Sequence, residues 1–150
     1  MYNTFVKIID GNKEAQILDE KIKNLISNSD ENIGKLAIIQ IGNNPSSKKY
    51  ISIKEKVAKS LGIDIEIHNF DDAETKERLS QMVQDIVTNR EVTGVIIQLP
   101  LPSTNLNFLL DLIPDEKDID VLSSGSQEKD RKSTRLNPSH NDISRMPSSA

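Results

Sequence analysis

The 150-residue sequence predicts a three-layer α/β/α fold, in which a small parallel sheet lies between helices, followed by a disordered C-terminal tail. Helical periodicities alternate with short apolar runs through residues 10–112, and the connections between them are short. Two of these runs are nearly continuous, which is typical of strands buried on both faces. With 35% hydrophobic residues, the chain can form one domain of ordinary core size but not a second full domain.

The first predicted helix follows Asp10-Gly11-Asn12, which supplies capping side chains for a helix of about 16 residues. Its apolar residues recur at helical spacing, at Ala15, Ile17, Leu18, Ile22, Leu25 and Ile26. The run at residues 35–41 is too short for an ordinary helix and ends at the turn residues 42–45, so it predicts a buried strand.

The later elements repeat this alternation. A helix is expected at residues 46–61, stopped by Gly62, and the spacing of Ile63, Ile65 and Ile67 predicts a short strand after it. Another helix is expected at about residues 74–89, a third strand at 93–99 and a short helix at 105–112.

The chain changes in character after Val121. Residues 123–150 are rich in Ser, Arg, Asn and Pro, and their apolar residues follow neither the helical nor the strand spacing. This predicts a folded domain at 1–122 and a disordered tail at 123–150. Residues 131–150 also resemble a translated cloning adaptor, so they carry no functional inference.

Composition excludes several classes of function. The formal charge of −4 and the mixing of Lys with acidic residues leave no basic stripe for nucleic acid. The absence of cysteine excludes a disulfide, a thiolate nucleophile and a Cys-ligated zinc, and no metal site is predicted. The N-terminus does not read as a signal peptide and no apolar run is long enough for a membrane span, so the expected compartment is the cytoplasm.

Lys54 is the most informative residue of the second predicted helix. A helical wheel places it near the middle of an apolar arc formed by Tyr50, Ile53, Val57, Ala58 and Leu61. Lys54 either extends its ammonium to water along the edge of the core, or is a partly buried amine suited to proton transfer. Tyr50, one turn earlier, either packs in the core or stacks on a flat ligand.

Two further segments are candidates for a site. Gln98 ends the third predicted strand, at the edge of a parallel sheet where ligands bind, and Pro100 and Pro102 stiffen the chain after it. The alternative is a simple loop that ends the strand. Residues 114–121 form an acidic turn, whose four acids within six residues do not reveal which one would bind a ligand.

These segments, residues 42–54, 94–102 and 114–120, resemble in order and separation the methylenetetrahydrofolate dehydrogenase/cyclohydrolase family. The similarity spans about residues 6–121, and Ile8-Ile9-Asp10-Gly11 is similar to the family's first turn. The resemblance implies that Lys54 transfers protons in the cyclohydrolase step with the help of Gln98. It also implies that Tyr50, Pro100 and Asp120 bind the substrate, with Asp120 on the pterin.

The family's chemistry belongs to folate one-carbon metabolism, which feeds purine biosynthesis. It consists of NADP-dependent oxidation of methylenetetrahydrofolate, followed by hydrolysis of methenyltetrahydrofolate to the formyl compound. The resemblance therefore implies tetrahydrofolate substrates, an NADP cofactor and a homodimer for a full-length parent. No cofactor-binding residues are expected in this chain, because residues 42–45 lack the Gly-x-Gly-x-x-Gly spacing of a dinucleotide loop.

The sequence departs from the family after Asp120. Where the family continues with Gly, this chain has Val121, and the family's Rossmann domain and C-terminal helix do not follow. An inactive fragment or a folate-binding module without turnover is therefore the alternative function. Without the family's C-terminal helix, apolar surface of this domain is expected to be exposed and to cause self-association. The spacing of Ser47, Tyr50 and Lys54 also matches short-chain dehydrogenases, in which a Gly-rich nucleotide-binding loop lies far before the Tyr and Lys. Only 49 residues precede Tyr50 here and none forms such a loop, which disfavours this class of enzyme.

Overall fold

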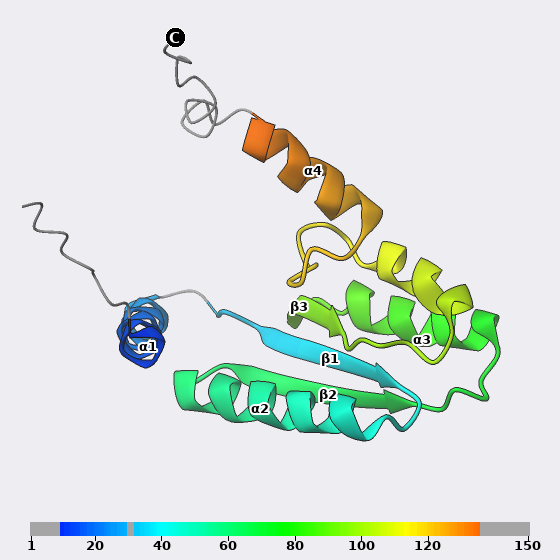
Figure 1. Cartoon of the computed structure of the whole chain (residues 1–150), viewed down its shortest axis with the longest axis horizontal. Coiled ribbons are helices and arrows are strands. Elements are labelled where there is room, and N and C mark those ends of the chain that lie inside the picture. The colour runs from blue at the N-terminus through cyan, green and yellow to red at the C-terminus, as the bar shows by residue number, and fades with distance from the viewer. Residues whose placement is uncertain (1–9, 30–31, 136–150) are drawn as a thin grey trace, which may run out of the picture.

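The computed structural model describes residues 10–29 and 32–135. The elements alternate as the sequence predicts (Figure 1). In chain order they are α1 (Gly11–Ser27), β1 (Lys35–Ile41), α2 (Pro45–Leu61), β2 (Asp64–Phe70), α3 (Lys76–Thr88), β3 (Val92–Ile97), the 3-10 helix η1 (Thr104–Leu112) and α4 (Ser124–Arg135).

The sheet has three parallel strands in the order β2-β1-β3. Ile38 of the central strand pairs with Ile67 of β2 and Ile96 of β3. Residues 37–41 of β1 are buried, which explains why the strand is a continuous apolar run. The predicted parallel sheet is therefore confirmed.

The two faces of the sheet bury different residues. One face packs against α3 and η1, where Ile39 and Ile97 join Leu79, Val83 and Leu109 in the larger core cluster. The other face packs against α2, where Ile38 and Ile96 join Ile51 in a smaller cluster. Helices thus cover both faces of the sheet, and the three-layer prediction is confirmed.

The helix boundaries follow from local chemistry. The Asp10 side chain accepts hydrogen bonds from the Asn12 and Lys13 amides at the start of α1. The Asn44 side chain accepts hydrogen bonds from the Ser46 and Ser47 amides at the start of α2, where Pro45 occupies the first turn. Gly62 ends α2 in the left-handed conformation, with φ of 78°.

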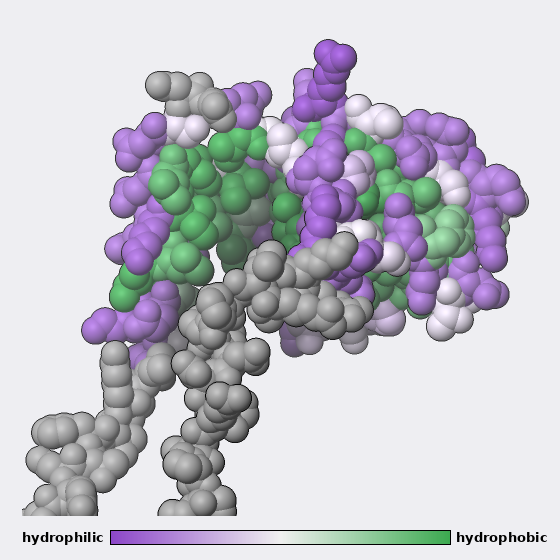
Figure 2. All heavy atoms as spheres, turned by 90° about the horizontal axis from the view of Figure 1, so that it is seen from above, coloured by the Kyte–Doolittle hydropathy of each residue, from purple (hydrophilic) through white to green (hydrophobic). Residues whose placement is uncertain are grey.

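The helix α1 lies apart from the main core. None of its residues is buried, and Leu25 is 72% exposed. Figure 2 shows apolar surface on the lobe at the left, where α1 lies, facing a hollow beside the rest of the molecule. A pocket of about 360 Å³ lies there, between the end of α1, the start of β1 and the turn that carries Ile119. The expected exposure of apolar surface is therefore present.

The chain after Ser123 differs in part from the prediction of a disordered tail. Residues Ser124–Arg135 form the helix α4, whereas residues 136–150 lie outside the described residues. The Ser123 hydroxyl accepts a hydrogen bond from the Ser126 amide, and Asp111 accepts one from the Ser124 amide. One local contact and one contact from Asp111, 13 residues before Ser124, thus start a helix that hydrophobic periodicity does not reveal. The proposed domain boundary at residue 122 stays a prediction.

In the described part of the chain, no helix is long and apolar enough to cross a membrane.

Candidate functional site

Lys54 lies on the side of α2 that faces the sheet. The buried residues of this helix are Ser47, Ile51, Ala58 and Leu61, and Lys54 falls between them in the same stripe. The apolar arc of the helical wheel is only partly buried, because Ile53 and Val57 are exposed and Tyr50 is 60% exposed. The packing interface is therefore rotated away from Tyr50, and of the two alternatives for this residue the structure contradicts packing in the core.

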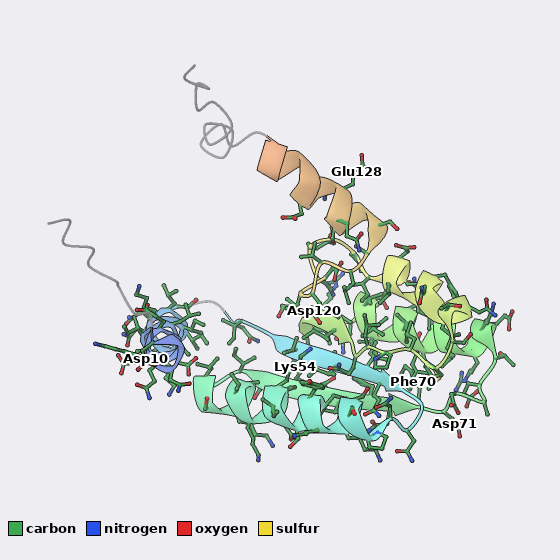
Figure 3. The ribbon with its side chains drawn as sticks, viewed as in Figure 1. Asp10, Lys54, Phe70, Asp71, Asp120 and Glu128 are labelled. Atoms are coloured by element: carbon green, nitrogen blue, oxygen red, sulfur yellow. The ribbon has the colours of Figure 1, made fainter. Side chains whose placement is uncertain are left out.

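Lys54 forms an ion pair with Asp120. The Lys54 Nζ atom lies 3.4 Å from Asp120 Oδ2, and the side chains are 35% and 37% exposed. Figure 3 shows the two residues on separate elements, with Lys54 on α2 and Asp120 on the turn that follows η1. Both groups are accessible to a ligand, and the structure thus brings these two predicted site residues together.

The turn that carries Asp120 lies against the outer edge of β3. The Val95 amide donates to the Lys117 carbonyl over 2.7 Å, and the Ile119 amide donates to the Val95 carbonyl over 3.4 Å. These bonds add a short parallel bridge between Val95 and Asp118. Gly94 permits the close approach of Ile119, and together these contacts place Asp120 beside α2.

The structure distinguishes among the acids of this turn. Asp118 is only 8% exposed, and its carboxylate accepts hydrogen bonds from the Leu122 and Ser123 amides. Burial alone would raise the pKa of Asp118, but the hydrogen bonds from Ser123, Ser126 and Leu122 outweigh it and hold the pKa below its ordinary value. Asp115 pairs with Lys129. Asp120 is thus the acid that faces Lys54.

Sequence reasoning missed the structural role of Asp118. The sequence holds no local signal for this role, because residues 115–117 and 119–120 are turn and residue 118 makes only an isolated bridge, so spacing does not separate Asp118 from Asp120. Val121, which stands where the resemblance implies Gly, has φ of 54°, the left-handed conformation.

Gln98 supplies an unpaired acceptor near the carboxyl end of β3. Its side-chain amide donates to the Leu99 carbonyl over 2.8 Å, while its Oε1 atom is buried and has no hydrogen-bond partner among the residues that the structure describes. By alternation along the strand, Gln98 lies on the same face as Ile96, which is the face that packs against α2. A buried acceptor of this kind favours a ligand or side chain that donates a hydrogen bond.

The remaining predicted residues line the surface near this face. Pro100 is exposed and follows a cis peptide bond from Leu99. The Leu99 carbonyl also accepts a hydrogen bond from the Ser47 hydroxyl over 3.4 Å, which joins this loop to the start of α2. Tyr50 lies one turn before Lys54 and presents its side chain to solvent.

The turn after β1 does not fit a dinucleotide pyrophosphate. A Cβ atom at Gly42 would lie 3.1 Å from Pro102 Cγ and 3.2 Å from a carboxylate oxygen of Asp72, so the turn is closed on that side and faces a negative charge. The Ser46 and Ser47 amides at the start of α2 already donate to Asn44. Among the described residues, moreover, no group of three His, Cys, Asp or Glu could hold a metal ion.

Residues 9–120 match the family described as tetrahydrofolate dehydrogenase/cyclohydrolase, catalytic domain. The chain belongs to this family. The segments 42–54 and 94–102 both lie within the matched tetrahydrofolate dehydrogenase/cyclohydrolase catalytic domain, and they bring Lys54 and Gln98 to one face of the sheet.

A curated relative of this family is the bifunctional protein FolD of Mycoplasmopsis synoviae. It is 39% identical over 123 residues, which cover 79% of this chain and 42% of the relative. A similar protein from Acholeplasma laidlawii is 33% identical over 121 residues and is covered to 43%. The chain therefore spans less than half the length of these relatives.

A solved structure with the same fold is a 5,10-methylenetetrahydrofolate dehydrogenase from the silkworm, Bombyx mori. Its TM-score is 0.73 at 29% identity, over 83% of this chain and 44% of the silkworm chain. This tetrahydrofolate dehydrogenase confirms the α/β architecture of the domain.

Proposed function

We propose that this chain is the folate-binding part of a bifunctional methylenetetrahydrofolate dehydrogenase/cyclohydrolase of one-carbon metabolism. The observation that carries the proposal is the Lys54–Asp120 pair, on the sheet face to which Gln98 also belongs, in a chain of this family. In a parent of the length of its relatives, we further propose a homodimer in the cytoplasm that oxidises methylenetetrahydrofolate and supplies purine biosynthesis.

The proposed binding mode follows from charge and hydrogen-bonding capacity. The Asp120 carboxylate accepts hydrogen bonds from the N–H groups of a pterin ring, which would compete with Lys54 for the same oxygen. The exposed ring of Tyr50, on the same helix as Lys54, offers a face for stacking. Pro100 borders the ligand at the end of β3, without a backbone N–H of its own.

The proposed hydrolysis needs one group that first accepts a proton from water and then donates a proton to a ring nitrogen. Water adds to the methenyl carbon, the bond from this carbon to one ring nitrogen breaks, and that nitrogen receives a proton as the formyl group forms. The second proton of water leaves to solvent, because the substrate is a cation and the product is neutral at this centre. Once the pterin has displaced it from Asp120, Lys54 accepts the first proton as a neutral amine and returns it to the nitrogen as an ammonium, and Gln98 Oε1 orients this ammonium or the water.

The dehydrogenase half of the function is assigned to the longer parent. NADP would accept a hydride from the substrate there, and a structure of the Trypanosoma brucei enzyme is described as a complex with NADP and an inhibitor. That structure is 23% identical to this chain and supports the fold alone. The turn at Gly42, which Pro102 and the Asp72 carboxylate crowd on one side, gives no support to a pyrophosphate site at that turn.

The test measures binding and hydrolysis separately. Calorimetry with a tetrahydrofolate analogue is expected to detect binding that Tyr50→Ala and Asp120→Asn weaken by about 10-fold or more. Lys54→Met is expected to lower methenyltetrahydrofolate hydrolysis by roughly 10²- to 10⁴-fold in the active parent. The control is Lys59→Met, which alters an exposed lysine on the same helix that pairs with Glu55.

Three outcomes have distinct meanings. Hydrolysis that is lost with Lys54→Met and retained with Lys59→Met supports the enzyme. Binding by a folded wild-type chain without hydrolysis supports the folate-binding module, which the open setting of the Lys54–Asp120 pair also favours. Binding that Asp120→Asn and Tyr50→Ala leave unchanged contradicts the proposed site.

A further inference from the structure

The start of α4 holds the buried carboxylate of Asp118. The Ser123 amide donates to Asp118 Oδ2 over 2.9 Å, and the Leu122 amide donates to Asp118 Oδ1 over 3.3 Å. Ser123 and Ser126 are themselves buried, with exposed fractions of 3% and 7%. The residues that follow the family-like segment are thus packed around an acid within it.

Two other carboxylates anchor the same turn of α4. Asp111, from η1, accepts a hydrogen bond from the Ser124 amide over 2.8 Å. Asp115 accepts one from the Ser126 hydroxyl over 3.5 Å and pairs with Lys129 over 2.6 Å. The positive end of the helix dipole therefore lies against three acids, an arrangement that stabilises both the helix start and the acidic turn.

Asp120 is fixed on both sides by this arrangement. Before it, Ile119 packs over Gly94 and donates to the Val95 carbonyl. After it, Val121 turns the chain in the left-handed conformation toward the residues that cap Asp118. The Asp120 side chain pairs with Lys54, whereas the Asp118 side chain turns to the start of α4.

We propose that Asp118 is a positioning residue for Asp120, and that residues 122–126, which lead into α4 and begin its first turn, are the part of the chain that holds it there. Without the Asp118 anchor, the turn detaches from α4 and Asp120 leaves Lys54 for water. The consequence for folate binding rests on the proposed function, but the geometric relation does not. Residues that follow the family-like segment thereby become part of the binding site's support.

A spectroscopic test on the full 150-residue chain is independent of any ligand. The side-chain resonance of Lys54 is followed by NMR while Asp120 is changed to Asn in two backgrounds. In the wild-type background, Asp120→Asn is expected to shift the Lys54 resonance, because the ion pair is lost. In the Asp118→Asn background, the same change is expected to shift it by less than about half as much, since the pair is already largely broken.

The matched control is Asp111→Asn. It removes a carboxylate that also caps α4 but lies outside the Asp120 turn. The Lys54 response to Asp120→Asn should stay as in the wild type in this background. An equal response in the Asp118→Asn and wild-type backgrounds would overturn the proposal. An Asp111→Asn effect as large as that of Asp118→Asn would also overturn it, because the position of Asp120 would then not depend specifically on Asp118.

Ligand binding provides a second readout. If the wild-type chain binds a tetrahydrofolate analogue, Asp118→Asn is expected to weaken binding by about 10-fold and Asp111→Asn by less than about 2-fold. Unchanged affinity in Asp118→Asn would contradict the positioning role in binding. Absence of wild-type binding would count against the proposed function, while the Lys54 resonance would still decide whether Asp118 positions Asp120.

Discussion

Gly94 lies so close beneath Ile119 that a Cβ atom at residue 94 would come within 2.9 Å of Ile119 Cγ1 and Cδ1. Leu36 Cδ1, at 3.3 Å from the same point, closes another side of this space. The absence of a side chain at Gly94 of β3 therefore allows the turn that carries Asp120 to pack against the sheet.

Gly94→Ala is expected to displace Ile119 and to destabilise the domain by about 1–3 kcal/mol, because the added methyl group overpacks the contact. Urea unfolding measures this change. Gly11→Ala is the control, since a Cβ atom at Gly11 meets nothing within 4 Å and alanine favours the helix. Equal stability of Gly94→Ala and the wild type would mean that the turn moves aside freely.

Val121→Gly is expected to stabilise the domain by roughly 1 kcal/mol. Val121 has φ of 54°, which is strained for a β-branched residue and ordinary for glycine. Thermal unfolding of both forms tests this expectation. Val57→Gly, at an exposed position inside α2, should do the opposite and destabilise by about 1 kcal/mol. A loss of stability in Val121→Gly would show that the valine side chain has an essential contact.

Asp118 should make the stability of the domain depend on acidic pH. Its pKa is lowered in the folded state, so the folded state favours the charged form. This contribution is complete above the unfolded-state pKa, near about 4, and is lost as the pH falls through the lower folded-state pKa. Urea unfolding between about pH 5 and pH 2 should therefore show a weaker pH dependence in Asp118→Asn than in the wild type. Parallel curves for the two proteins would argue against a charged Asp118 in the fold.

The exposed apolar side of α1 is expected to cause self-association at high concentration. Leu25 is the most exposed of its large apolar residues, and none of the helix is buried. Sedimentation velocity over a concentration series should show association that Leu25→Gln reduces. Glu20→Gln is the matched control, because it changes polarity on the same helix without removing apolar surface. A monodisperse wild-type chain at high concentration would contradict this expectation.

The sheet and its helices could be predicted because their signals are local. The strand β1 is apolar at almost every residue, since both of its faces are covered, and Asp10, Asn44 and Gly62 mark helix ends by short-range hydrogen bonds or backbone conformation. The predicted boundaries are therefore close to those of the structure, although β2 continues to Phe70, beyond the alternating isoleucines.

The less predictable features depend on tertiary contacts. The helix α4 has no apolar periodicity, and acids distant in sequence, such as Asp111, hold its start. The helical wheel gave the apolar arc of α2 but not the rotation of the helix against the sheet. In the structure this rotation leaves Tyr50 exposed. Composition could not separate Asp118 from Asp120 either. The family resemblance selected Asp120, and the contact with Lys54 supports that choice.

The order β2-β1-β3 also determines how the nascent chain can fold on the ribosome. The central strand β1 is synthesised first, and both of its parallel partners arrive only after an intervening helix. Its isoleucine-rich segment therefore emerges with unpaired backbone groups on both edges. The edge that pairs with β3 can form its hydrogen bonds only after translation has passed Ile97. Slow decoding between α2 and β3 would prolong the exposure of this segment and favour aggregation during synthesis.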